Sequence, residues 1–115
     1  MLISVPELLA EAGKNVRLLD AVAAMAECTD KGGTVIDVRE PGEVQAKPAA
    51  ESLNIPRGVL EMMALEKFQD ANHSIYLHCA NGTRATLAAE QLARLGYADV
   101  TVISCGIDAV CEAQS

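Results

Sequence analysis

Residues 75–84 read Ile75-Tyr76-Leu77-His78-Cys79-Ala80-Asn81-Gly82-Thr83-Arg84. The run Ile75–His78 predicts a buried strand, because a short β-branched and aromatic run between turn residues is typical of one. Apolar side chains at helical spacing follow from Ala85 to Leu95, and Gly96 is a natural helix stop. The stretch therefore predicts a strand that passes through a short polar loop into a helix.

The loop after this strand combines a thiol with backbone donors. If it curls round Cys79, its N–H groups form an anion-binding nest at a helix N-terminus. This nest would be built by Ala80, Asn81, Gly82, Thr83 and Arg84. Gly82 permits the required backbone conformation, and Arg84 adds a fixed positive charge. The same field favours the thiolate, which is the nucleophilic form of Cys79.

We therefore interpret Cys79 as a catalytic nucleophile and residues 80–84 as its substrate-binding loop. The alternative is that Cys79 is a small buried hydrophobe at a strand end, which is the common fate of a lone cysteine. The strand, Gly82, Arg84 and the following helix together favour the functional interpretation.

The rest of the chain alternates between strand and helix patterns. Further strands are predicted at Thr34–Val38, Ser52–Ile55 and Val100–Ile103. Further helices are predicted at Val16–Ala26, at Val59–Phe68 and after Ser4, which forms a capping box with Glu7. Such alternation predicts an α/β fold with a parallel sheet and helices on both faces, as one domain over residues 1–115.

Composition excludes several classes of function. The formal net charge of -7 disfavours nucleic acid as a partner. No apolar run is long enough to span a bilayer and no secretory signal is visible, so we expect no membrane association. Cysteine spacing without a CxxC pair fits a reduced, cytoplasmic setting. His73 and His78 lack metal-ligand spacing, so we expect no metal and no cofactor.

The motifs resemble those of the rhodanese superfamily, whose active-site loop reads Cys-x-x-Gly-x-Arg at a strand-to-helix junction. Cys79, Gly82 and Arg84 match that loop. The resemblance continues through Val35–Glu40 with Glu43, Asn54–Pro56, Leu95–Tyr97 and Val100. It implies about five parallel strands and a sulfurtransferase that carries sulfane sulfur as a persulfide on Cys79.

The resemblance also implies the reaction partners. The donor would be thiosulfate or a persulfide, and the acceptor a thiol, including a protein thiol, or cyanide. Four residues separate Cys79 from Arg84, whereas related phosphatases and arsenate reductases have five, so loop length disfavours those activities. A rhodanese-like module that binds a protein or senses oxidants stays the alternative. The oligomeric state is left open.

Several positions depart from the family pattern. Lys47–Ser52 replaces the usual Gly-His-Ile-x-Gly-Ala, and Ala80 stands where thiosulfate-using members often have a basic residue. Thiosulfate is therefore expected to be a poor donor. Cys105 replaces a glycine near the active-site rim, which suggests either a second thiol that attacks oxidised Cys79 or a small residue that only fills space. By resemblance, Asp37, Arg39, Glu40 and Glu43 tie loops together.

Overall fold

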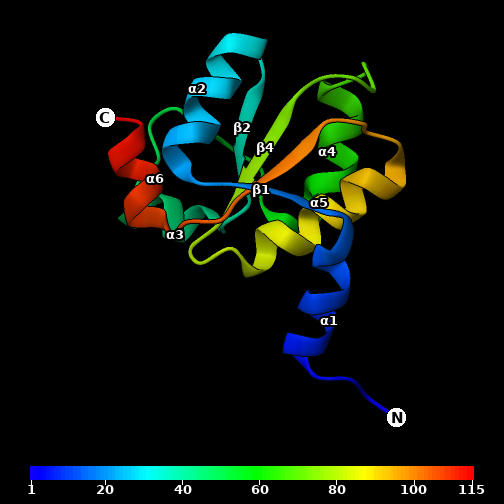
Figure 1. The fold of residues 1–115 in the computed structure, drawn as a ribbon. Helices are drawn as coiled ribbons and strands as arrows, with labels where there is room; N and C mark the ends of the chain where they lie inside the picture. The colour runs from blue at the N-terminus through cyan, green and yellow to red at the C-terminus, as the bar shows by residue number, and fades with distance from the viewer.

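Five parallel strands form the centre of the computed structural model, which describes residues 1–115 (Figure 1). The strands are β1 (Arg17–Leu19), β2 (Thr34–Asp37), β3 (Leu53–Asn54), β4 (Ile75–His78) and β5 (Val100–Ile103). Their order across the sheet is β1-β5-β4-β2-β3. The predicted α/β class with a five-stranded parallel sheet is confirmed.

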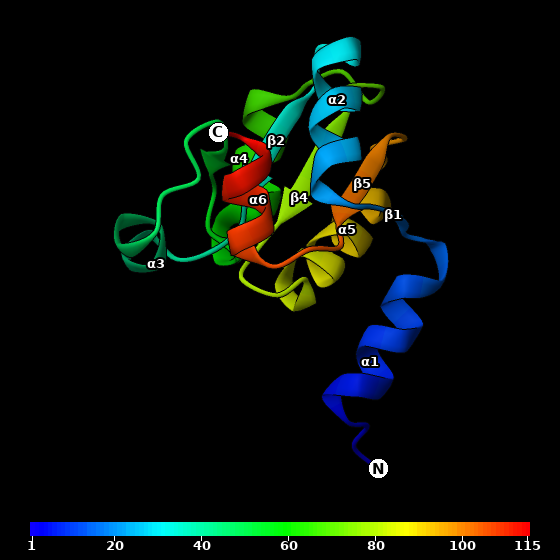
Figure 2. The same cartoon turned by 60° about the vertical axis from the view of Figure 1, so that its left-hand side comes forward.

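Helices cover both faces of the sheet (Figure 2). They are α1 (Val5–Ala12), α2 (Ala21–Lys31), α3 (Pro41–Ala46), α4 (Leu60–Lys67), α5 (Thr83–Leu95) and α6 (Ile107–Ala113), with short 3-10 turns at Gly13–Asn15 and Arg57–Val59. The larger core cluster packs α4 and α5 against one face. The smaller one packs α2 and α6 against the other. None of the helices is long and apolar enough to cross a membrane.

Local sequence explains where several helices begin and end. The Ser4–Glu7 capping box opens α1, as predicted, and Pro6 lies in its first turn. Gly96 ends α5 with a φ of 113°, in the left-handed region that glycine favours. The predicted strands and the helices Val59–Phe68 and Ala85–Leu95 are confirmed within one or two residues at most termini.

The predicted helix Val16–Ala26 is wrong over its first part. Residues 17–19 form β1, which pairs with β5, and Asp20 then caps α2 through its side chain and the Ala23 N–H. The apolar residues Leu18 and Leu19 fit a helical period as well as a strand, so the pattern is ambiguous there. Residues 17–19 adopt the strand conformation because they pair with β5, which is far away in the sequence.

The candidate site residues gather where parallel strands end. β2 ends at Asp37 and β4 at His78, and these two residues are register partners. The segments that follow them, residues 38–43 and 79–84, therefore leave the sheet at the same edge. This edge carries Cys79 and its loop.

Candidate active site

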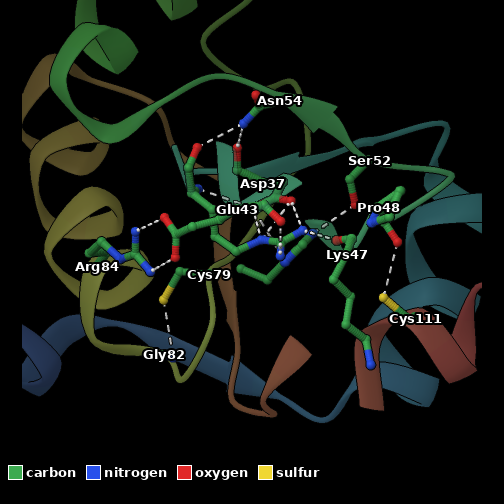
Figure 3. Close-up of polar contacts among 12 residues, drawn as sticks. Asp37, Glu43, Lys47, Pro48, Ser52, Asn54, Cys79, Gly82, Arg84 and Cys111 are labelled. Atoms are coloured by element: carbon green, nitrogen blue, oxygen red, sulfur yellow. Dashed lines mark hydrogen bonds and ion pairs between the residues drawn. The ribbon is translucent and has the colours of Figure 1, made fainter. Parts of the chain in front are cut away.

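Cys79 follows β4 directly and has no exposed surface. It belongs to the larger core cluster. Its sulfur accepts a hydrogen bond from the backbone N–H of Gly82 at 3.1 Å (Figure 3). Of the predicted nest donors, the Gly82 N–H therefore contacts the sulfur, whereas the Thr83 N–H donates to the side chain of Asn81.

The loop conformation depends on Gly82. Its φ is 93°, which only glycine adopts readily, and it stands at the N-cap of α5. The side chain of Asn81 accepts the Thr83 N–H at 3.1 Å, and Thr86 Oγ1 donates to the Gly82 carbonyl at 2.9 Å. These contacts hold the α5 N-terminus, with the positive end of its dipole, against Cys79.

Arg84 is engaged by a carboxylate from α3. Its Nη1 and Nη2 atoms donate to the two oxygens of Glu43 at 2.6 and 2.9 Å, and Figure 3 shows this pair beside the Cys79 sulfur. The Glu40 N–H donates to the same carboxylate at 2.9 Å. Arg84, followed by that N–H, lowers the pKa of Glu43 to about 2. Sequence analysis noted both residues but missed their pairing, since only the fold brings them together.

A buried ion pair supports the segment after β2. Arg39 donates to Asp37 at 2.7 Å, and both side chains are almost fully buried. Arg39 also donates to the Lys47 carbonyl, while Asn54 donates to the carbonyls of Asp37 and Arg39. These contacts agree with the loop-tying role expected for Asp37 and Arg39.

His78 lies in a separate buried network. Its Nε2 is 2.7 Å from Ser52 Oγ, which also accepts a hydrogen bond from Gln114 at 2.8 Å. Its Nδ1 has no hydrogen-bond partner and lies 3.9 Å from Asp37. Burial lowers the pKa of His78, which favours the neutral ring. Sequence analysis gave no signal for Gln114.

The four cysteines are free and occupy different surroundings. Cys105 Sγ accepts the Ala21 N–H at 3.3 Å and packs against the α2 and α6 cluster, whereas Cys79 belongs to the cluster on the other face. The backbone after Cys105 does reach the loop, because the Ile107 N–H donates to the Ala80 carbonyl. The contacts of Cys105 thus favour its space-filling alternative over attack on Cys79.

A surface hollow borders the outer side of the loop. Its volume is about 340 Å³, and Asn81, Gly82 and Thr83 line it together with Leu9 and Leu18. Cys79 does not line it. Because Cys79 has no exposed surface, a reagent reaches its sulfur only if the surrounding loops move. No group of three or more His, Cys, Asp or Glu side chains is placed to hold a metal ion.

The structure has a parallel sheet covered by helices and a thiol loop at the β4–α5 junction. The sequence motifs predict this arrangement. The rhodanese-like domain family matches residues 18–113, and the chain belongs to this family. Helix α1 lies outside the matched residues.

Individual relatives are distant. A mitochondrial protein of Schizosaccharomyces pombe, proposed to be a thiosulfate sulfurtransferase, is 30% identical over 82 residues, covering 62% of this chain and 58% of its own length. The chain thus spans under two thirds of that relative.

Solved structures share the fold. The polysulfide-sulfur transferase homodimer of Wolinella succinogenes has a TM-score of 0.72 and 25% identity, covering 92% of this chain and 80% of that one. A rhodanese-related protein of Thermoplasma volcanium has a TM-score of 0.64 and 32% identity, and the match covers 84% of this chain and 91% of that one. A Rhodopseudomonas palustris protein described as a possible tyrosine phosphatase has a TM-score of 0.84 and 24% identity. The match covers 98% of this chain and 92% of that one, and it shows a shared fold.

Proposed function

We propose that this protein is a sulfurtransferase that carries sulfane sulfur as a persulfide on Cys79. The observation that carries the proposal is the Gly82 N–H directed at the Cys79 sulfur, at the N-terminus of α5. A donor in this position stabilises negative charge on the sulfur of the Cys79 thiolate. Family membership and the names of the S. pombe and W. succinogenes relatives support the same chemistry.

The reaction is a double displacement. The Cys79 thiolate attacks the outer sulfur of the donor, a new S–S bond forms, and the donor's own bond to that sulfur breaks. The leaving group, sulfite from thiosulfate or a thiolate from a persulfide, departs with the electron pair. An acceptor thiolate or cyanide then attacks the outer sulfur of Cys79 and restores the thiolate.

A second candidate function is a rhodanese-like module that senses oxidants or binds a protein. The complete burial of Cys79 favours the protein-binding form of this candidate, because a buried thiol is the common structural cysteine. It disfavours oxidant sensing, which needs an accessible thiol. A phosphatase is disfavoured, since only four residues separate Cys79 from Arg84.

Intact mass spectrometry distinguishes these candidates. The reduced protein is incubated with thiosulfate or with cysteine persulfide, and then with cyanide. We expect a gain of one sulfur atom that cyanide removes, absent in Cys79→Ser and retained in Cys111→Ser. If no donor adds sulfur to Cys79 in the folded protein, the sulfurtransferase proposal is wrong and the second candidate takes its place.

A further inference from the structure

The guanidinium of Arg84 already pairs with a carboxylate through both terminal nitrogens. Both of its terminal nitrogens donate to Glu43, in a bidentate pair that fixes the orientation of the guanidinium. Glu43 is itself held by the Glu40 N–H, so its carboxylate is positioned by α3 as well as by Arg84. A donor anion that binds the same edge of the Arg84 guanidinium must therefore displace a pre-positioned carboxylate.

No other cation near the loop substitutes for Arg84. Arg39 is buried and fully engaged with Asp37 and with backbone carbonyls. Lys47 pairs with Asp108 on α6. Within the loop, Ala80, Asn81 and Thr83 are uncharged.

The local charge is negative. Glu43 and Glu40 both act electrostatically on Arg84, as does Cys79. Asp37 neutralises the charge of Arg39. Glu40 and Glu43 carry two negative charges against the one positive charge of Arg84, so one negative charge is in excess around the thiol. The chain as a whole has a net charge of -7, which includes these residues. A dianion approaching Cys79 is therefore repelled, and a donor with a single charge is repelled less.

We infer that Glu43 determines donor specificity by occupying Arg84, so that the site uses persulfides with a single net negative charge and discriminates against thiosulfate. This inference rests on the proposed sulfurtransferase activity. With a persulfide, the Cys79 thiol and R-S-S⁻ give Cys79-S-S⁻ and R-SH. One S–S bond breaks, one forms, and the proton of Cys79 passes to the leaving sulfur.

The test compares two donors on Glu43→Gln. Loading of one sulfur onto Cys79 is followed by mass spectrometry, at donor concentrations where the rate is proportional to concentration. Freeing Arg84 should raise the ratio of the thiosulfate rate to the cysteine persulfide rate by at least about tenfold. An unchanged or lower ratio would overturn the inference.

Two further variants separate specificity from general effects. Glu40→Gln removes the same charge from the same segment but leaves the Arg84 pair intact, so its donor ratio should change by less than that of Glu43→Gln. Glu43→Gln combined with Arg84→Gln should lose the thiosulfate gain, because the freed cation is gone. A gain that persists in the double variant contradicts the inference.

Folding and basal activity are checked independently. Far-UV circular dichroism establishes that each variant is folded before its donor ratio is measured. If the wild type accepts no donor, the proposed function fails. If it accepts cysteine persulfide but Glu43→Gln leaves the ratio unchanged, only the inference about Glu43 fails.

Discussion

Gly82 connects backbone conformation with the proposed chemistry at the level of one residue. Its left-handed φ of 93° turns its N–H toward the Cys79 sulfur, and a Cβ at this position would meet open space. The constraint on this residue is therefore the backbone angle and not crowding. Any substitution strains the same peptide that holds the thiol.

We expect Gly82→Ala to lose about 1–2 kcal/mol of unfolding free energy, the cost of a left-handed non-glycine residue. It should also slow sulfur loading of Cys79. Gly96→Ala is the matched control, because Gly96 has a φ of 113° and open space but lies at the far end of α5. Urea unfolding should show a similar loss for both variants. Equal loading rates in the two variants would contradict the role of the Gly82 N–H.

Helix α6 fixes the segment that departs from the family pattern. The side chain of Gln114, just after the helix, accepts the Glu51 N–H at 3.3 Å and donates to Ser52 at 2.8 Å. Cys111 donates to the Pro48 carbonyl at 3.3 Å. Residues 47–52 are therefore held by the C-terminal helix and, through Ser52, by His78.

Gln114→Ala should loosen this segment without disturbing the sheet. Each lost hydrogen bond contributes about 0.5–1.5 kcal/mol, so exchange of the Glu51 amide should quicken by about two- to tenfold. Hydrogen–deuterium exchange measures this. Gln91→Ala, a half-buried glutamine on α5 with no contact to this segment, should leave the Glu51 amide unchanged. Unchanged exchange in Gln114→Ala would show that other contacts hold the segment.

The sequence predicted correctly those helices and strands in which several neighbouring residues indicate the same structure. The β4–loop–α5 unit combines an apolar run, a glycine in the loop and a glycine stop, and each acts on its neighbours. Strand β1 lacked such agreement, because its three residues pair only with β5, more than 80 positions away. Likewise Arg84 and Glu43 lie 41 positions apart, so their contact depends on the finished sheet.

At the scale of the whole molecule, a polar cluster centred on Glu27 ties helix α2 to strands β1 and β4 of the sheet. Tyr76, fully buried in β4, donates to Glu27 on α2 at 2.6 Å. Arg17 on β1 pairs with the same carboxylate, and Lys31 lies 3.6 Å from it. Hydrogen bonds from Arg17 and then Tyr76 lower the pKa of Glu27 from 4.5 to about 2.

This cluster predicts how the protein responds to acid. The pKa of Glu27 is lower in the folded state than in the unfolded chain. Its contribution to the free energy of unfolding is therefore complete above pH 4.5 and is lost as the pH falls toward about 2. Glu27→Gln should therefore be less stable at neutral pH and lose less stability between these values. Urea unfolding at a series of pH values measures this, with exposed Glu66→Gln as control. If the stability of Glu27→Gln depends on pH in the same way as that of the wild type, Glu27 does not cause the acid response.

The complete burial of Cys79 has a kinetic consequence. A reagent of any kind meets the sulfur only during transient openings of the loop. At high donor concentration, loading should therefore reach a ceiling set by the opening rate and common to all donors. The same opening also limits attack by peroxide, so burial protects the Cys79 sulfur from irreversible oxidation while the loop is closed.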